Sequence, residues 1–367
     1  MKIVEVIPDL AFGGAERFVT DLCNSLSNNN NQVTLITFFN IDKKESFFPL
    51  LSNKIRFVCL NKKVGLSLTL PFILLYNILK EKPQVVHTHL NCIDYCILAW
   101  ILLRRISFIH TVHNDAIEEA GGSLGLMIRK LAFGRFVKPV TISNESQKSF
   151  WSLYKKESTL IYNGRPKDDD SNYIDSNLRR KVDSLRSSNQ TFIIINIARF
   201  AAQKNQLSLV KAVNIVNKDI PKVDLLLVGS FNHSQDAMDI YNTIQKVKTE
   251  HIHILGAKSD ATQYLKYADA FCLSSVFEGM PISIIESFAY GCPVLSTPVG
   301  GVVDMVEDKV NGMLSKDTSI ESIAEMIDDF CRLAQSDREL LSKNAKKAYE
   351  KYSMDLCVRN YLLCFRK

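Results

Sequence analysis

The sequence has 367 residues, with 45 Lys and Arg against 39 Asp and Glu for a formal charge of +6, and 46% of its residues are hydrophobic. This balance excludes a disordered tail, a collagen-like rod and a low-complexity scaffold, and the length suffices for two domains that each bury a core. The positive charge is spread along the chain, so we expect no nucleic-acid partner.

Nine cysteines without a CxxC pair predict reduced structural thiols and no zinc site. The closest two, Cys92 and Cys96, fit one face of a buried helix. The N-terminal MKIVEVIPDLAFGGAE lacks the pattern of a signal peptide. The apolar stretches Leu66–Leu79 and Tyr95–Leu103 are shorter than the about 18 residues that span a bilayer. We therefore expect a cytoplasmic protein, either soluble or bound to the inner face of a membrane.

In the first part of the chain, short apolar runs alternate with segments of helical period. A helix is expected at about Ala15–Leu26. Runs such as VTLITFF suit strands that are covered on both faces, which favours a parallel sheet with crossover helices. The pattern predicts an α/β, doubly wound domain over residues 1–164, with strands at Ile3–Pro8, Val33–Phe39, Arg56–Leu60, Val85–His89, Phe108–Val112 and Val140–Ser143.

The polar composition of residues 165–190 predicts a linker with a short charged helix in its second half. The alternation of strands and helices then restarts, which predicts a second Rossmann-like domain over residues 191–352. Residues 353–367 carry apolar side chains at helical spacing and are expected to pack back on the first domain. Strands of the second domain are expected at Phe192–Ala198, Val223–Val228, His251–Leu255, Ala270–Ser274 and Pro293–Ser296.

The stretch Ser274–Gly301 is the most informative part of the sequence. A strand ends near Ser274, a Glu-Gly-Met-Pro turn follows, and an apolar-periodic helix runs from about Pro281 to Tyr290. Free backbone amides at the start of a helix suit a phosphate. Glu278 precedes this helix, and Glu286 lies about two turns along it. By themselves, these carboxylates fit either recognition of hydroxyls at two points of a ligand, or a capping and a solvated glutamate.

The run EGMPISIIE, followed by SFAYGCPVLSTPVGG, closely resembles the E-x7-E signature of the retaining glycosyltransferases of family four, which have the GT-B fold. This resemblance implies two Rossmann-like domains that face a central cleft. It also implies transfer of a sugar from a nucleotide-diphosphate sugar to an acceptor hydroxyl. The resemblance continues in order through IPDLAFGGAERFVTDL, VVHTHL, IHTVHND, VTISNESQKSF, LIYNG, FIIINIARFAAQKNQLSLVKAV, DLLLVGSF, IHILGAKSDATQYLKYADAFCLSSV and VEDKVNGMLS.

For the second domain, the resemblance implies a donor site. Arg199 and Lys204 would contact the diphosphate and stabilise the charge of the leaving phosphate. Glu278 would meet sugar hydroxyls, and Glu286 would accept hydrogen bonds from the ribose. The remaining donor-binding residues are expected at the start of the helix and in the segment that holds the base through backbone groups: Gly279, Met280, Pro281, Ile282, Gly256 and Ala257. Backbone recognition leaves the base undetermined, and a UDP-sugar is favoured.

In the first domain, the resemblance places Gly13 and Gly14 opposite the donor phosphate or sugar, although an ordinary turn between strand and helix fits the same residues. It places His113, directly after the strand Phe108–Val112, beside the reacting centre. His87 and His110 fall within strands and are expected to be buried. His89, at the end of its strand, remains undecided between these two roles.

No DxD motif of a metal-dependent transferase is present, and Asp168–Asp170 fits a solvated acidic turn in the linker. Since Arg199, Lys204 and a helix start supply positive charge, we expect neither a metal nor a cofactor. No carboxylate is placed to act as a nucleophile on the far face of the sugar. We therefore expect front-face attack, in which the departing phosphate takes the acceptor proton.

The acceptor is expected to be a saccharide or a lipid-linked oligosaccharide of capsule or lipopolysaccharide assembly. Leu66–Leu79 and Tyr95–Leu103 fit either a face that rests on an anionic membrane or crossover helices packed in a core. The cations assigned to this membrane face are Lys80, Arg104, Arg105, Arg129, Lys130, Arg135 and Lys138.

Three other functions fit the same fold class: an inverting GT-B transferase, a nucleotide-sugar epimerase, and an inactive nucleotide-sugar sensor or scaffold. A nicotinamide dehydrogenase is disfavoured because the glycine fingerprint GxGxxG and its acidic ribose partner are absent.

Overall fold

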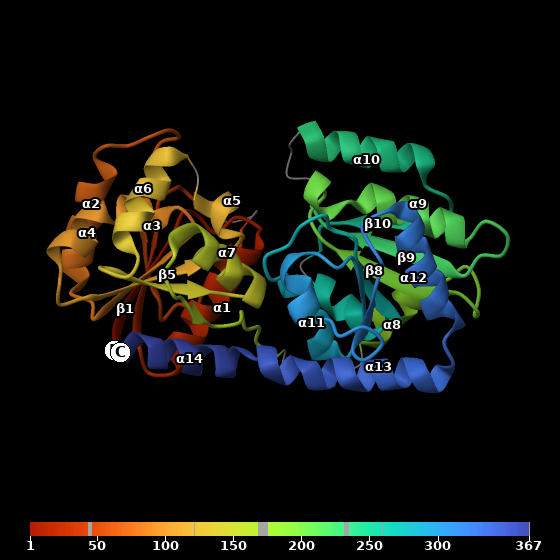
Figure 1. Ribbon diagram of the computed structural model, residues 1–367. Helices are drawn as coiled ribbons and strands as arrows, with labels where there is room; N and C mark the ends of the chain where they lie inside the picture. The colour runs from red at the N-terminus through yellow and green to blue at the C-terminus, as the bar shows by residue number, and fades with distance from the viewer. Residues whose placement is uncertain (43–45, 121, 168–174, 231–234, 259, 367) are drawn as a thin grey trace. The chain divides into compact units, whose positions relative to one another are not determined.

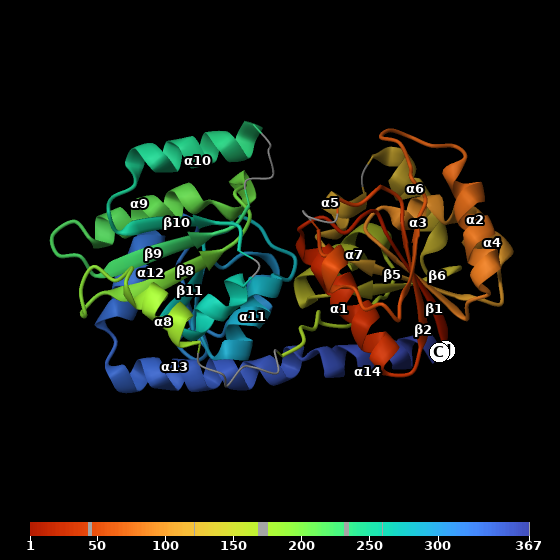
Figure 2. The ribbon, with the colours of Figure 1, turned by 180° about the vertical axis from the view of Figure 1, so that it is seen from behind.

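The computed structural model describes residues 1–42, 46–120, 122–167, 175–230, 235–258 and 260–366. The chain forms two compact units, shown from opposite sides in Figures 1 and 2. The first unit comprises Met1–Pro166 together with Tyr352–Lys367, and the second comprises Lys167–Lys351. The predicted Asp168–Asp170 turn lies outside the described residues.

The first unit is built on a parallel sheet of seven strands in the order β3-β2-β1-β4-β5-β6-β7. Its strands are β1 (Lys2–Ile7), β2 (Gln32–Thr37), β3 (Arg56–Cys59), β4 (Val85–His89), β5 (Ser107–Val112), β6 (Val137–Thr141) and β7 (Thr159–Leu160). Its helices are α1 (Gly14–Asn28), α2 (Leu70–Glu81), α3 (Cys92–Tyr95), α4 (Ile97–Leu102), α5 (Ala116–Ala120), α6 (Ser123–Ala132), α7 (Asn144–Tyr154) and α14 (Met354–Arg366), and η1 (Phe48–Leu50) is a 3-10 turn.

Strand alternation divides the side chains of this sheet between two faces. Val4 and Val6 of β1 pack into the core formed with α2, α3 and α4. Glu5 therefore points to the opposite face, where α1 and α14 pack against each other. Tyr361 of α14 lies there, with its ring centroid 6.1 Å from that of Phe18 of α1. The C-terminal helix is thus part of the first unit, 250 residues beyond β5, with which Tyr361 shares a hydrogen bond.

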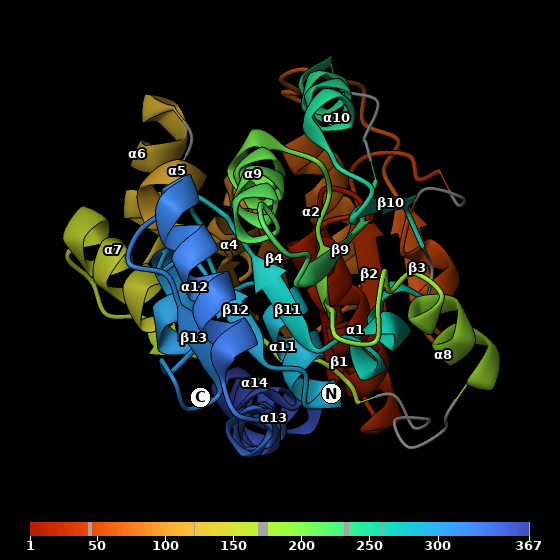
Figure 3. The same ribbon diagram turned by 90° about the vertical axis from the view of Figure 1, so that its right-hand side faces the viewer.

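The second unit contains a parallel sheet of six strands in the order β10-β9-β8-β11-β12-β13. Figure 3 shows α9 and α12 side by side over it. The strands are β8 (Phe192–Ile197), β9 (Val223–Val228), β10 (Ile252–Gly256), β11 (Ala270–Leu273), β12 (Val294–Ser296) and β13 (Gly312–Leu314). The helices are α8 (Ser176–Asp183), α9 (Gln206–Val216), α10 (Gln235–Val247), α11 (Ile282–Tyr290), α12 (Ile320–Arg332) and α13 (Gln335–Ala348), with 3-10 turns η2 (Ala202–Lys204), η3 (Ala261–Lys266) and η4 (Gly300–Asp304). The chain passes from the second unit to the first within a further 3-10 turn, η5 (Tyr349–Tyr352).

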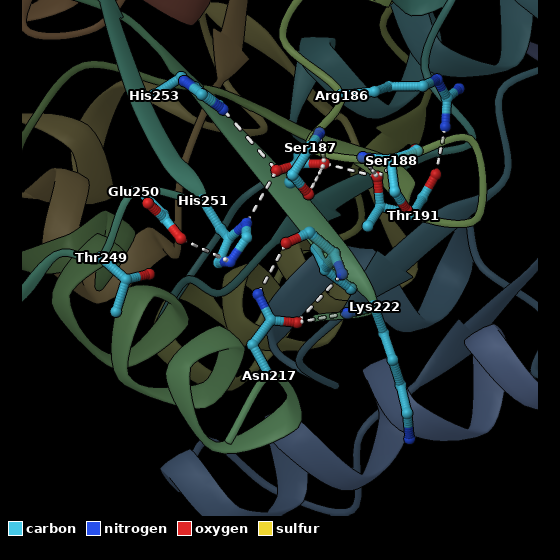
Figure 4. Close-up of polar contacts among 12 residues, drawn as sticks. Arg186, Ser187, Ser188, Thr191, Asn217, Lys222, Thr249, Glu250, His251 and His253 are labelled. Carbon is cyan, nitrogen blue, oxygen red and sulfur yellow. Dashed lines mark hydrogen bonds and ion pairs between the residues drawn. The ribbon is translucent and has the colours of Figure 1, made fainter. Parts of the chain in front are cut away.

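A buried carboxylate lies at the amino end of the second sheet. Asp224, near the start of β9, has 0% exposure and accepts hydrogen bonds from the Ser187 backbone N–H at 2.8 Å and the Thr191 hydroxyl at 2.6 Å. His251 Nδ1 lies 3.2 Å from its other oxygen. Figure 4 labels the Asp224 partners Ser187, Thr191 and His251. Burial acts to raise the pKa of Asp224, but the net effect is a lowered pKa, because His253 lies 3.8 Å away and Thr191 and Ser187 donate hydrogen bonds to the carboxylate. This cluster secures the chain that enters β8.

The predicted α/β class, with two doubly wound parallel sheets, is confirmed. The strand expected at Val140–Ser143 is three residues too late, since β6 begins at Val137. The short strands β7 and β13 were not expected. The predicted linker 165–190 is too long: Arg165 is buried in the first unit, and α8 buries Leu178 and Val182 in the second. All nine cysteines are free, and seven are buried.

Candidate active site

The predicted donor residues gather where the second sheet changes its winding direction. β8 lies beside β11, and the chain leaves this pair toward β9 on one side and β12 on the other. In open parallel sheets, ligands bind outside the carboxyl ends of the strands at such a point. Arg199 follows the end of β8 by two residues, and Ser274 directly follows β11. The two loops that begin here carry Arg199, Lys204 and Glu278.

These two loops are joined by hydrogen bonds. The Gln203 side chain donates to the Phe277 carbonyl at 3.0 Å, and the Val276 backbone N–H donates to the Gln203 carbonyl at 2.9 Å. The Ser274 hydroxyl lies 3.0 Å from the carbonyl oxygen of Lys204, to which it donates. Because the loops share these contacts, the side chains of Lys204 and Glu278 are held at a fixed separation.

Lys204 and Glu278 form an ion pair, with 2.5 Å between Nζ and Oε1. The Ser275 hydroxyl donates to the same carboxylate oxygen, also at 2.5 Å. The side chain of Glu278 is only 6% exposed, and that of Lys204 is 17% exposed. A carboxylate so enclosed needs a partner, and here it has an ammonium and a hydroxyl. The sequence predicted separate contacts to a ligand for these two residues, but not their contact with each other.

A glycine-rich loop after β12 supports the Glu278 turn. Gly300 has a φ of +48°, and a Cβ atom there would lie 1.8 Å from the Glu278 carbonyl oxygen. The Gly301 backbone N–H donates to that same oxygen at 3.2 Å. The Thr297 hydroxyl donates to the Ser275 carbonyl at 2.6 Å. Only glycine fits at position 300, so this loop fixes the backbone from which the Glu278 side chain projects.

Helix α11 begins directly after this turn, as predicted. Pro281 is its N-cap residue in extended conformation, and no side chain caps the first turn. Ile284, Ile285 and Phe288 are buried, whereas Glu286 is partly exposed. The helix therefore directs its uncapped amides to the carboxyl edge of the sheet and keeps Glu286 off the buried face.

Two further predicted positions lie at this edge. Arg199 is exposed, and its carbonyl accepts a hydrogen bond from the Gln206 side chain at 2.8 Å. Gly256 ends β10 with a φ of +69°, followed by the exposed Ala257. The structure thus brings Arg199, Lys204, Glu278 and the start of α11 to the central strands, and places Gly256 and Ala257 at the outer strand of the same edge.

In the first unit, His113 directly follows β5 and joins a buried chain of side chains. Its Nε2 lies 2.9 Å from Nδ1 of His89, and Nε2 of His89 lies 2.9 Å from Oε2 of Glu5. Burial lowers the pKa of His89 to about 4 and that of His113 well below its usual value of 6.5. Burial acts to raise the pKa of Glu5, but the adjacent His87 and His89 bring it down to about 2. Near neutral pH, Glu5 is thus ionised, and the imidazoles of His89 and His113 are neutral.

Glu119 holds the backbone at His113. Its Oε2 accepts the His113 backbone N–H at 2.7 Å, and its Oε1 lies 3.1 Å from Nε2 of His110. Arg129 lies 3.6 Å from Glu119 Oε1 and 3.1 Å from Asp94 Oδ1. Arg129, expected among surface cations, is instead 2% exposed, because these two carboxylates take it into the interior.

The turn at Gly13 and Gly14 starts α1. Gly13 is its N-cap residue in an extended conformation with a φ of −154°, and Gly14 is exposed. The carboxylate of Glu16 lies over this turn, since a Cβ atom on Gly13 would come within 2.2 Å of Glu16 Oε2. A phosphate at these amides would have to share them with the chain's own anion.

One compact group of possible metal ligands occurs among the described residues. Glu5, His87 and His89 each offer an atom within 4.8 Å of the others, and all three are fully buried. In the structure, His89 Nε2 and His87 Nδ1 both lie 2.9 Å from the same Glu5 oxygen. The nitrogen atoms of His87 and His89 already contact the Glu5 carboxylate, so we assign this group to the row of buried side chains that ends at His113.

Several residues of these sites were not predicted. Glu5 was missed, although a carboxylate inside the apolar run KIVEVI must find a partner once buried. Ser275, Gly300 and Glu119 gave no comparable signal. His87 and His110 are fully buried, as predicted, and His89 proves to be buried as well.

Comparisons with known proteins bear on the family and the fold of this chain. The model for "Glycosyl transferases group 1" matches residues 179–348, and that for "Glycosyltransferase Family 4" matches residues 12–168. The chain is 27% identical over 273 residues to the Escherichia coli UDP-Gal:alpha-D-GlcNAc-diphosphoundecaprenol alpha-1,3-galactosyltransferase, covering 70% of this chain and 69% of the relative.

A second relative is the Campylobacter jejuni GalNAc-alpha-(1->4)-GalNAc-alpha-(1->3)-diNAcBac-PP-undecaprenol alpha-1,4-N-acetyl-D-galactosaminyltransferase. It is 25% identical over 326 residues, which are 86% of this chain and 84% of that enzyme. The crystal structure of Anabaena HepE in complex with UDP and glucose has a TM-score of 0.82 at 19% identity, covering 100% of this chain and 99% of that one. This chain therefore belongs to the family 4 (group 1) glycosyltransferases, with the GT-B fold.

Proposed function

We propose that this protein is a retaining glycosyltransferase that moves a sugar from a UDP-sugar to a hydroxyl of a lipid-linked saccharide. The observation that carries the proposal is the gathering of Arg199, Lys204 and the uncapped start of α11 at one edge of the second sheet. Two cations and free backbone amides suit the diphosphate of a nucleotide sugar. UDP is favoured because one relative is named for UDP-Gal and a similar structure contains UDP.

Cleavage of the bond between sugar and diphosphate builds negative charge on the leaving oxygen. In the proposed mechanism, Arg199 and Lys204 stabilise that charge from fixed positions, without a metal ion. The leaving phosphate then takes the proton of the acceptor hydroxyl as this hydroxyl attacks from the same face of the sugar.

The pairing of Lys204 with Glu278 refines the two proposed roles. Both Lys204 and Ser275 contact Oε1 of Glu278. Oε2 of Glu278 has no partner among the described residues, so it is the oxygen we assign to a sugar hydroxyl. Glu278 then has two tasks: it orients the ammonium group toward the diphosphate, and it binds the sugar that is transferred.

A lipid-linked acceptor is supported by the exposed side of α2. Its buried side consists of Leu70, Leu74 and Ile78, yet the opposite side is apolar as well. Phe72 is 64% exposed and Tyr76 is 66% exposed. A water-facing helix normally carries polar side chains there, so this surface fits an apolar partner. We call Phe72, Ile73, Tyr76 and Leu79 the apolar face of α2.

Exposed cations adjoin this face. Lys80 and Lys82 lie at the end of α2, and Arg104 and Arg105 follow the neighbouring helix α4. Apolar side chains flanked by cations are typical of surfaces that rest on anionic membranes. Two relatives are named for acceptors on undecaprenyl diphosphate, and we propose an acceptor of that class, reached at the inner face of a membrane. In the part of the chain that the structure describes, no helix is long and apolar enough to cross the bilayer.

A transfer assay tests the proposal. The purified protein is supplied with UDP-Gal, UDP-Glc, UDP-GlcNAc or UDP-GalNAc, a lipid-diphosphate-linked GlcNAc acceptor and EDTA. NMR of the product then gives its anomeric configuration. An α-linked product from an α-linked donor is expected. A β-linked product would establish an inverting enzyme, and UDP binding without any transfer would favour a nucleotide-sugar sensor.

A second assay tests the membrane face. Sedimentation with vesicles that contain anionic phosphatidylglycerol is expected to recover the protein at low salt, and much less of the double variant Phe72→Ser/Tyr76→Ser. Equal recovery of both proteins would remove the apolar face of α2 from the proposal.

A further inference from the structure

The side chains behind His113 have a defined direction of hydrogen bonding. The His113–His89 and His89–Glu5 contacts are each 2.9 Å long, and each needs one proton between its two atoms. Glu5 is fully buried and its carboxylate only accepts hydrogen bonds. His89 must therefore carry its proton on Nε2, which faces Glu5.

The position of the proton on His89 also determines its position on His113. A neutral imidazole carries a proton on only one nitrogen, so Nδ1 of His89 has a lone pair. The proton in the second contact must then belong to Nε2 of His113. Its Nδ1 consequently has a lone pair too. Nδ1 of His113 has no hydrogen-bond partner among the described residues, and it is not one of their enclosed, unpaired atoms.

The surroundings favour neutral imidazoles. His89 is 0% exposed and His113 is 6% exposed. The ring of Phe18 lies edge-on to His113, with 5.7 Å between centroids, and the backbone N–H of His113 is held by Glu119. The titratable groups that act on His113 are the imidazoles of His89, His110 and His87, and they lower its pKa in the same direction as burial does. At His89, Glu5 acts to raise the pKa, but burial outweighs it.

Given the sugar transfer proposed above, on which this inference rests, we propose that Glu5 and His89 are positioning residues that hold His113 as its Nε2–H tautomer. Nδ1 of His113 then accepts a hydrogen bond from a hydroxyl group. An atom with a lone pair repels phosphate oxygens and attracts an O–H donor. His113 thus selects a sugar hydroxyl and not the diphosphate as its partner.

A second arm of the network supplies a control. His87 Nε2 lies 2.8 Å from the Thr111 hydroxyl, which lies 2.9 Å from the Tyr361 hydroxyl. His87 Nδ1 approaches Glu5 Oε2 at 2.9 Å but is not aligned for a hydrogen bond. Tyr361→Phe removes a polar atom from the same buried region without touching the line from Glu5 to His113.

The test uses ¹⁵N-labelled full-length protein. Two-bond ¹H–¹⁵N spectra at neutral pH are expected to show His89 and His113 as Nε2–H tautomers in the wild type and in Tyr361→Phe. In Glu5→Gln, the amide can donate as well as accept, so both histidines are expected to lose the single tautomer. Its kcat is expected to fall about 10-fold or more with little change in donor KM, as when a carboxylate that orients a catalytic imidazole is lost. Tyr361→Phe is expected to keep the wild-type kcat.

A proton on Nδ1 of His113 in the wild type would overturn the inference, and so would Glu5→Gln with wild-type kcat. A Glu5→Gln protein that keeps the tautomers but melts at a lower temperature would show a merely structural role, and would overturn it too. Failure of the proposed function looks different: the wild type would transfer no sugar, whatever tautomer the spectra show.

Discussion

Lys204 and Glu278, 74 residues apart in sequence, meet with 2.5 Å between Nζ and Oε1. This contact joins the loop after β8 to the loop after β11. The Lys204 ammonium neutralises the enclosed carboxylate of Glu278. The same ion pair holds this ammonium beside the start of α11, so it both stabilises the site and fixes a positive charge there.

Replacement of Lys204 by Met is expected to lower kcat/KM about 100-fold or more, the scale on which loss of one fixed group that stabilises a transition state is felt. It is also expected to cost about 1–3 kcal/mol of stability, because Glu278 loses a charged partner. Steady-state kinetics and denaturant unfolding measure the two effects. Lys211→Met, an exposed position on α9, is the matched control and is expected to leave both quantities unchanged. Wild-type kcat/KM in Lys204→Met would remove Lys204 from the mechanism.

Gly300→Ala is expected to cost more than about 2 kcal/mol and to abolish transfer, because the new Cβ would overlap the Glu278 carbonyl. Gly65→Ala separates this clash from backbone strain. Gly65 also has a positive φ, +102°, but a Cβ atom there meets nothing within 4 Å. It is expected to cost only about 1 kcal/mol. Equal unfolding free energies for the two variants would contradict the packing described for Gly300.

Arg129→Met is expected to destabilise the protein by about 3–5 kcal/mol, because it leaves Asp94 and Glu119 without their buried cation. Since Glu119 also binds the backbone of His113, kcat should fall in the fraction that remains folded. Lys130→Met, the next residue of α6, is exposed and should be neutral. Similar melting temperatures for the two variants would show that Arg129 does not lie in the interior.

Stability is expected to fall as the pH is lowered from 7 to about 4. In the unfolded chain, His89 binds a proton near pH 6.5, whereas in the folded state it does so only near pH 4. As the pH falls, the unfolded state therefore binds protons before the folded state does. Each such histidine lowers the free energy of unfolding by up to about 1.4 kcal/mol per pH unit, and His110 and His113 act in the same direction as His89.

Glu5 extends this dependence to lower pH. Its stabilisation is complete above its ordinary pKa of 4.5 and disappears as the pH falls toward 2. Urea unfolding at pH 7, 6, 5 and 4 measures the upper part of the range, and His89→Asn should show a shallower slope. A flat profile between pH 7 and 5 would contradict neutral buried histidines.

The sequence indicated where chemistry gathers more reliably than which side chains touch. Arg199 and Glu278 follow strands, and parallel strands end at a common edge, so their proximity was predictable. The Lys204–Glu278 contact was not, because it depends on loop hydrogen bonds from Gln203 and Ser274 that follow no periodicity.

For Arg129, the sequence predicted the wrong environment. A charged side chain next to Lys130 is expected at the surface, but Arg129 lies with Ala132 on the buried side of α6. What takes it inside is the pairing with Asp94 and Glu119, from segments 35 and 10 residues earlier in the chain. Helical period alone gives no sign of such a pairing.

The most direct test of the central claim is calorimetric titration of wild type and Glu286→Ala with UDP, GDP and ADP in the presence of EDTA. We expect tight binding of one diphosphate, UDP, to the wild type and a loss of about 10-fold or more in the variant, since a carboxylate that accepts two ribose hydroxyls is worth about 1.4 kcal/mol or more. Absence of binding by all three diphosphates, or binding that survives the substitution unchanged, would contradict a nucleotide-sugar site at this edge of the second sheet.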